Sequence, residues 1–166
     1  MAELEEVIKK DDVQIITITE SWGQTWKEAS LEIEGFNMYK KHRADGRRGG
    51  GCLIYVSKEL KSYACKQMEN VPGDDSVWCW VKIADGARIL VGCIYRSPTS
   101  SVENNELIMN QIVKASEVAD QNRILLMGDF NVKEINWIEV EATGGKNPYH
   151  TDSMNALKIA FCTSMY

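Results

Sequence analysis

The sequence lacks the features of secreted and membrane-spanning proteins. None of its apolar runs approaches the ~20 residues that a transmembrane helix needs. Its N-terminal segment, residues 2–8, is acidic and has no apolar core of the kind that a signal peptide carries. We therefore expect an intracellular protein without a membrane partner, located in the nucleus if it acts on DNA and otherwise in the cytoplasm.

The cysteines form no pattern typical of a disulfide framework or a zinc site. Their number is odd, and no Cys-x-x-Cys pair occurs. Most of them lie in apolar, strand-like runs, where cysteine behaves as a small hydrophobic residue. We therefore expect structural, buried thiols; the residues concerned are Cys52, Cys65, Cys79, Cys93 and Cys162.

An excess of positive charge is also missing. The formal net charge is −5 and the isoelectric point is about 5.1, whereas strong non-specific binding to nucleic acid usually needs a basic face. The one basic cluster comprises residues 40–43 together with Arg47 and Arg48. Two interpretations of this cluster stay open: it contacts DNA phosphates or acts as a nuclear signal, or it is a solvated loop.

What the sequence does contain is enough apolar material for one folded domain. Its 166 residues are 44% hydrophobic and include no internal repeat, low-complexity stretch or linker, so residues 1–166 are expected to form a single domain. Strands interleaved with a few helices are typical of the α+β class. Periodicity predicts strands at residues 13–19, 36–40, 52–56, 63–68, 76–83, 88–95 and 123–127, and helices at residues 2–10, 101–120 and 152–162.

One predicted strand shows both of its faces in the sequence. In residues 76–83, Trp78 and Trp80 share one face, and the smaller apolar residues between them share the other. The Asp85-Gly86 pair that follows is a hairpin signal. It predicts antiparallel pairing with residues 88–95.

Three apolar runs end on polar side chains suited to phosphate chemistry. Residues 123–127 lead into Gly128, Asp129, Phe130 and Asn131; residues 13–19 lead into Glu20; and residues 88–95 end on Tyr95, followed by Arg96. Because a strand places residues i and i+2 on the same side, Asp129 and Asn131 are predicted to face one site. A carboxylate can take a proton from water, and an amide can donate to a phosphoryl oxygen. The alternative is an ordinary turn that is rich in Asp and Asn.

The order of these motifs resembles the endonuclease/exonuclease/phosphatase superfamily. The matching segments are Ile-Thr-Glu-Ser-Trp at 18–22, Arg-Arg-Gly-Gly-Gly-Cys-Leu-Ile-Tyr-Val at 47–56, Gly-Cys-Ile-Tyr-Arg-Ser-Pro at 92–98 and Leu-Leu-Met-Gly-Asp-Phe-Asn at 125–131. The pattern is most similar to the endonuclease domain of non-LTR, LINE-type retrotransposons, and it extends over roughly residues 3–161. The resemblance implies a partial four-layer α/β/β/α sandwich, with mixed, mostly antiparallel sheets and outer helices.

The resemblance also implies a role for each matching residue. Glu20 would ligate a divalent metal, Tyr95 would bind the scissile phosphate, Asp129 would orient or deprotonate water, and Asn131 would steady the transition state. Hard oxygen ligands and a phosphate substrate indicate Mg²⁺ or Mn²⁺, without a small-molecule cofactor. The implied partner is DNA, with nucleic-acid contacts predicted for Arg43, Arg47, Arg48 and Arg96.

The sequence departs from the family pattern at both ends. The family's first-strand Asn, its later Asp and its closing Ser-Asp-His have no counterpart here. The histidines are His42 and His150, and the His150-Thr151-Asp152 segment has the wrong order for the closing motif. Pro98 stands where some relatives have Asn, and we interpret it as a trait of the retrotransposon branch. The resemblance therefore implies a shortened domain with weak or no activity.

Three functions remain open at this point. The first is a divalent-metal-dependent DNA endonuclease of a retrotransposon polyprotein. The second is a phosphoesterase that acts on a small or lipid substrate, and the third is a non-catalytic remnant of a decayed element. All three share one structural prediction: Glu20, Tyr95, Asp129 and Asn131 lie at one rim of the sheets.

Overall fold

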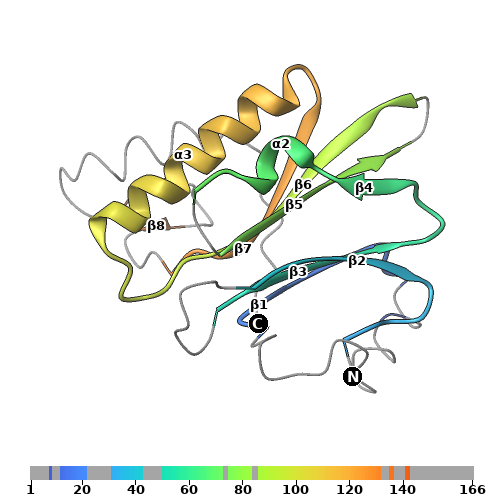
Figure 1. The fold of residues 1–166 in the computed structure, drawn as a ribbon, viewed down its shortest axis with the longest axis horizontal. Coiled ribbons are helices and arrows are strands. Elements are labelled where there is room, and N and C mark those ends of the chain that lie inside the picture. The colour runs from blue at the N-terminus through green and yellow to red at the C-terminus, as the bar shows by residue number, and fades with distance from the viewer. Residues whose placement is uncertain are drawn as a thin grey trace.

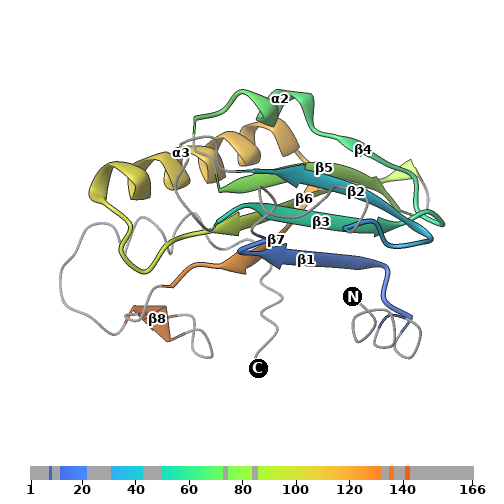
Figure 2. The ribbon, with the colours of Figure 1, turned by 60° about the horizontal axis from the view of Figure 1, so that its bottom comes forward.

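Two β-sheets packed face to face form the body of the molecule (Figure 1). The computed structural model describes residues 8, 12–21, 31–42, 50–72, 75–83, 86–131, 135–136 and 141–142. Figure 2 shows the sheets as stacked layers, with a long helix across the outer face of one of them. The predicted helices at 2–10 and 152–162 lie outside the described residues, apart from Ile8.

The first sheet has three antiparallel strands in the order β1-β3-β2. They are β1 (Ile15–Thr19), β2 (Phe36–Lys41) and β3 (Cys52–Ser57). In the central strand β3, alternate residues face opposite ways: Cys52, Ile54 and Val56 pack between the sheets. Leu53 and Tyr55 pack on the outer face with Ile33.

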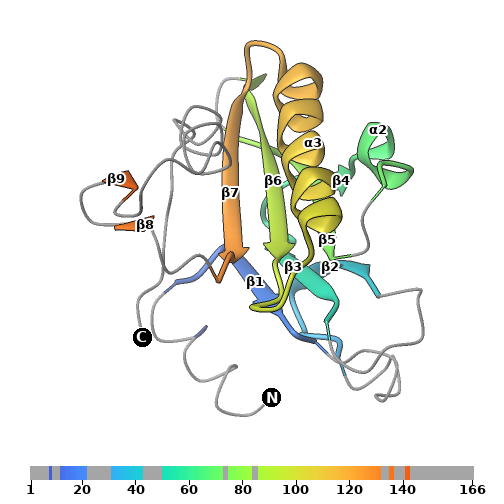
Figure 3. The same cartoon turned by 90° about the vertical axis from the view of Figure 1, so that its left-hand side faces the viewer.

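The second sheet has four strands in the order β4-β5-β6-β7. They are β4 (Ser62–Ala64), β5 (Ser76–Lys82), β6 (Arg88–Tyr95) and β7 (Arg123–Asp129). β5 and β6 are antiparallel, as the hairpin signal predicts. β6 and β7 are parallel, and the 18-residue helix α3 (Val102–Ala119) connects them along one face of the sheet (Figure 3).

The two faces of β5 are buried against different partners. Trp78 and Trp80 lie under α3, in a core that includes Ile108 and Ile112 of that helix. The smaller apolar residues of β5 pack between the sheets. The alternation predicted for this strand is therefore confirmed, and so is the α+β class. Of the four predicted layers, the described residues supply both sheets and one helical layer.

One predicted strand, residues 63–68, is wrong in its second half. The strand β4 ends at Ala64, and a short helix α2 (Lys66–Glu69) follows. Cys65 still donates its N–H to Trp78 O at 3.1 Å, and Met68 N then donates to Cys65 O at 2.9 Å. This turn buries the Met68 side chain against the core under α3, which offsets the lost strand pairing.

The four cysteines within the described residues are buried and free of disulfides, as predicted. They are Cys52, Cys65, Cys79 and Cys93; Cys162 lies outside the described residues. Burial raises the pKa of Cys79 to about 12, so its thiol is protonated and unreactive at neutral pH.

A further strand pair, β8 (Ile135–Asn136) with β9 (Glu141–Ala142), follows β7 in the sequence. No helix of the described part of the chain is long and apolar enough to cross a membrane.

Candidate active site

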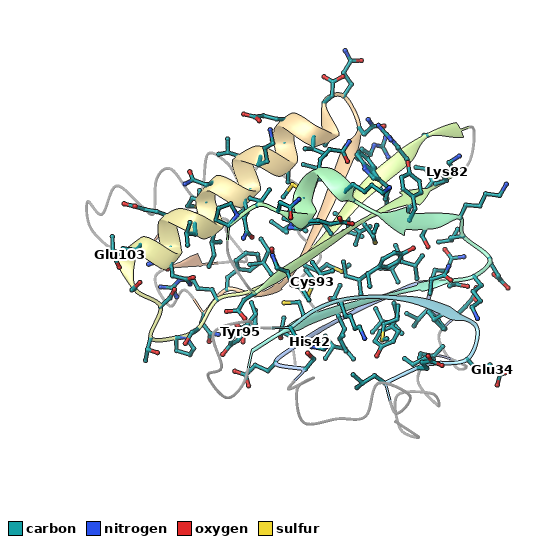
Figure 4. All side chains as sticks on the ribbon, viewed as in Figure 1. Glu34, His42, Lys82, Cys93, Tyr95 and Glu103 are labelled. Atoms are coloured by element: carbon teal, nitrogen blue, oxygen red, sulfur yellow. The ribbon has the colours of Figure 1, made fainter. Side chains whose placement is uncertain are left out.

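The ends of three strands bring the predicted site residues to one rim of the two sheets. β6 and β7 run parallel, and their last residues, Tyr95 and Asp129, are register partners. Glu20 directly follows β1 in the other sheet, and the Tyr95 hydroxyl donates a hydrogen bond to Glu20 Oε1. Figure 4 shows Tyr95 toward the left-hand ends of the strands and Lys82 toward their right-hand ends. The predicted convergence is confirmed, and the chemical role of each residue stays a prediction.

The Glu20 carboxylate is exposed, whereas the tyrosine that orients it is buried. Tyr95 is 5% exposed. Glu20 has φ of +52°, a left-handed conformation that is uncommon for a residue with a Cβ atom. The next residue, Ser21, donates its N–H to Gly51 O at 3.3 Å, which fastens the turn to the start of β3. Such unusual backbone, held by its surroundings, is common at functional sites.

Asp129 and Asn131 are neighbours because of a turn. β7 ends at Asp129, so the strand alternation that was expected to place Asn131 beside it does not extend that far. Instead Asn131 takes φ of +47° and donates its backbone N–H to Asp129 Oδ1 at 3.1 Å. Asparagine tolerates this conformation better than most residues, and Asp commonly accepts such a bond. The prediction that Asp129 and Asn131 lie close together is confirmed, but the predicted cause, strand alternation, is wrong.

The Asn131 side chain makes an internal contact. Its Nδ2 donates to Arg96 O at 2.9 Å. Arg96 in turn donates through Nη1 to Asn131 O at 2.9 Å and to Phe130 O at 3.3 Å, and through Nε to Asn105 Oδ1 of α3 at 2.8 Å. The turn after β7 is therefore fastened to the turn after β6 and, through Arg96, to the helix.

Asp75, which was not predicted as a site residue, joins the two sheets beside the site. Asp75 Oδ1 accepts from Gly51 N at 3.3 Å, and Asp75 O accepts from Tyr95 N at 2.8 Å and from Cys52 Sγ at 3.3 Å. It therefore links Tyr95 of the second sheet to Gly51, which in turn is bonded to Ser21. The surrounding Gly-Asp-Asp stretch is typical of any turn, so the sequence contains no signal for this role.

The basic cluster is only partly described. Lys41 ends β2 opposite Cys52, close to the Gly51 contact with Ser21, so the segment that carries the arginines starts and ends near the site. Gly51 has φ of +85°, and a Cβ atom there would lie 2.8 Å from Ser21 Oγ, so glycine is required at this approach. Arg43, Arg47 and Arg48 lie outside the described residues, and their predicted contacts with DNA stay predictions.

The donors at the rim suit a magnesium ion that is bound mainly by water and substrate. Within the described residues, no group of three or more His, Cys, Asp or Glu side chains is placed to hold a metal. Glu20 and Asp129 are both exposed carboxylates. Magnesium commonly uses one or two carboxylates together with waters and phosphate oxygens, so these donors fit that cation but do not form a dedicated cage.

Comparison with solved structures shows the same fold in several proteins. One is the endonuclease domain of TRAS1, a telomere-specific non-LTR retrotransposon, with a TM-score of 0.67 and 18% identity over 95% of this chain and 63% of that one. A functionally unknown conserved protein from Enterococcus faecalis V583 has a TM-score of 0.57 and 19% identity over 80% of this chain and 58% of its own. Truncated TDP2 from Caenorhabditis elegans has a TM-score of 0.51 and 16% identity over 86% and 58%.

This chain spans less than two thirds of the length of each of these three structures. A comparison with curated proteins finds no match. The model of the Endonuclease/Exonuclease/phosphatase family, however, matches residues 1–147. That match covers the two sheets, α3 and all four site residues, and the chain therefore belongs to the endonuclease/exonuclease/phosphatase family.

Proposed function

We propose that this chain carries the site of a divalent-metal-dependent DNA endonuclease of the non-LTR retrotransposon type. The observation that supports the proposal most is the link from Glu20 to Tyr95 across the two sheets, with Asp129 as the register partner of Tyr95. The order of motifs favours the retrotransposon branch, and the TRAS1 endonuclease domain has the same fold. That the substrate is DNA, and that one of its strands is cut, both belong to the proposal.

Each residue has a definite task in the proposed hydrolysis. The Tyr95 hydroxyl holds one oxygen of the Glu20 carboxylate, which leaves the other oxygen as a ligand for Mg²⁺ or Mn²⁺. A bound divalent ion would offset the charge that develops on the phosphate oxygens. Asp129 accepts the proton of a water that attacks phosphorus, the bond from phosphorus to the leaving oxygen then breaks, and the leaving oxygen takes a proton from solvent. Asn131 keeps the Asp129 carboxylate oriented through its backbone N–H.

Nicking of supercoiled plasmid by the purified chain, with and without magnesium, tests this proposal. A parallel assay of inositol phosphate release tests for a small-substrate phosphoesterase. Weak magnesium-dependent nicking without inositol phosphate release is the expected result, and the reverse would transfer the proposal to the phosphoesterase. The absence of both activities would favour a non-catalytic remnant. The nicking rate in the plasmid assay also tests the prediction that this chain is a weak catalyst.

Replacing Glu20 by glutamine should weaken magnesium binding. The change removes the charge of the carboxylate but keeps an oxygen that can accept from Tyr95. We expect the half-saturating magnesium concentration to rise by about 10-fold or more, because carboxylate charge dominates the attraction for this hard ion. Titration calorimetry gives a second readout, in which the wild-type chain should already bind weakly.

Glu59→Gln is the matched control for this change. Glu59 is exposed and follows β3 at the end opposite to Glu20, so its replacement should leave the magnesium response unchanged. Tight magnesium binding that survives Glu20→Gln would remove Glu20 from the proposed site.

Replacing Arg43, Arg47 and Arg48 together by alanine should flatten the salt dependence of DNA binding. If each arginine neutralises one phosphate, the slope of log affinity against log salt falls by about 3 in magnitude. A fluorescence anisotropy titration at several salt concentrations measures this slope. An unchanged slope would show that the three arginines lie in a solvated loop and do not contact DNA.

The matched control for the basic segment removes three charges at the other end of the sandwich. Lys58, Lys61 and Lys82 are all exposed there, and their triple alanine variant changes the net charge equally. It should leave the salt slope close to that of the wild-type chain. Equal flattening by both triple variants would show only a general effect of net charge.

A further inference from the structure

The contacts of Arg96 differ from those expected of an arginine whose side chain is available to bind a phosphate. It follows Tyr95 directly and is half-buried. Its guanidinium donates to three protein oxygens: Asn131 O at 2.9 Å, Phe130 O at 3.3 Å and Asn105 Oδ1 at 2.8 Å. A planar guanidinium can serve several acceptors at fixed angles, which an ammonium group cannot. The side chain is already engaged with protein oxygens on two sides.

The contacts between Arg96 and the turn after β7 are reciprocal. The Arg96 backbone N–H donates to Asp129 O at 2.8 Å, and Asn131 Nδ2 donates to Arg96 O at 2.9 Å. Together with the two guanidinium bonds to carbonyl oxygens, four hydrogen bonds join Arg96 to the segment Asp129–Asn131. Among the described residues, the hydrogen bonds of the guanidinium go to this segment and to Asn105.

The turn needs such support because its own backbone is unusual. Gly128 has φ of +141° and Asn131 has φ of +47°, so both flanks of the Asp129-Phe130 pair lie in the left-handed half of conformational space. Glycine adopts such a conformation at little cost, whereas a residue with a Cβ atom, here Asn131, keeps it only where the surrounding structure holds it. The Asp129 side chain is exposed, so packing does not hold the carboxylate in place.

Asn105 gives the arrangement a rigid base. It lies in the first turn of α3, close to the N-cap Ser101, whose Oγ accepts from Asn104 N at 3.3 Å. The helix packs on β6 and β7 through Ile108 and Ile112, so its first turn is fixed relative to the strand ends. The hydrogen bond from Arg96 Nε to Asn105 Oδ1 therefore fixes the position of the turn after β7 relative to the helix.

We propose that Arg96, held by Asn105, is a positioning residue that sets the place of the Asp129 carboxylate, and that it does not contact DNA. This inference rests on the proposed function for its effect on rate. Its structural part, the dependence of the turn on Arg96 and Asn105, does not.

The first test separates positioning from DNA contact by kinetics. Arg96→Gln should lower kcat for nicking by about 10- to 100-fold, because a misplacement near 1 Å has that effect on a reacting group. KM and the salt slope of DNA binding should stay unchanged, and Arg96→Lys should not restore kcat. A raised KM with a salt slope lower by about 1 would instead identify a phosphate contact and overturn the inference.

Two substitutions at Asn105 make the test specific, because this residue is not basic. Asn105→Asp keeps an oxygen that accepts from Arg96 Nε and should preserve kcat, whereas Asn105→Leu should lower kcat as Arg96→Gln does. Arg123→Gln, an exposed change at the start of β7 and so at the other end of the sheet, is the charge control. Equal kcat in the two Asn105 variants would overturn the inference.

Hydrogen exchange of the Asn131 backbone amide tests the positioning role without measuring catalysis. In the wild-type chain this amide is bonded to Asp129 Oδ1. Exchange should be faster in Arg96→Gln and Asn105→Leu and unchanged in Asn105→Asp and Arg123→Gln, with equal helix content by circular dichroism. Unchanged exchange in the first two variants refutes the positioning role. A wild-type chain that does not nick, but shows this exchange pattern, refutes the proposed function alone. Should Arg96→Gln fail to fold, the two Asn105 variants decide.

Discussion

Replacing Gly128 by alanine is expected to lower the free energy of unfolding by about 3 kcal/mol or more. A Cβ atom at this position would lie 1.9 Å from Ile94 O and 2.8 Å from Ile94 C and N. These are backbone atoms of the register partner in β6, so no side-chain rotation can relieve the overlap. β7 would have to separate from β6, which breaks the parallel pairing that carries Asp129 to the rim. Urea denaturation at equilibrium measures the loss.

Gly35→Ala is the control that separates the steric overlap from backbone strain. Gly35 has φ of +84°, and a Cβ atom there would meet nothing within 4 Å. Its substitution should therefore cost only the strain of a left-handed residue, about 1–2 kcal/mol. Losses of equal size in the two variants would show that strain alone explains Gly128, and that the close approach of β7 to β6 is not required.

The strands were predictable because their signals are local. The alternation in β5 places its two tryptophans under α3 and its small residues between the sheets, as residue order alone indicates. The helix α3 begins one residue after Ser101, a typical N-cap, and its buried residues Ile108 and Ile112 follow the helical spacing. The segment after β4 could not be placed in this way, because its apolar residues fit a strand and a helical turn equally well.

The gathering of the site residues was predictable from strand ends, but its details were not. Polar residues that follow apolar runs indicate a common rim, and Glu20 and Tyr95 do meet there. The turn that brings Asn131 to Asp129 depends on two positive φ angles, which the residue pattern does not determine. The link from Arg96 to Asn105 spans nine positions and the link from Gly51 to Asp75 spans 24, and their residue types are ordinary for helix starts and turns. Long-range contacts of this kind leave no local trace in the sequence.

Replacing Asp129 by asparagine is expected to lower the rate of magnesium-dependent nicking by about 10²- to 10⁴-fold, the usual contribution of a general base. The substitution is nearly isosteric. Asparagine retains an Oδ1 atom that can accept the Asn131 N–H, so the turn after β7 should persist and the amide exchange of Asn131 should stay as in the wild-type chain. What disappears is the carboxylate that takes the proton of the attacking water. The loss should therefore appear in kcat, with little change in KM for the plasmid.

Asp120→Asn is the matched control for this loss of charge. Asp120 is exposed at the far end of α3, remote from the rim, and asparagine has nearly the same size and shape, so this variant should nick at the wild-type rate. Alanine at position 129 adds a second comparison, because it removes both the base and the acceptor of the turn. If alanine reduces the rate far more than asparagine does, Asp129 acts chiefly by shaping the turn. If both reduce the rate equally while Asn131 exchange changes only in the alanine variant, the proton transfer itself is what the enzyme loses.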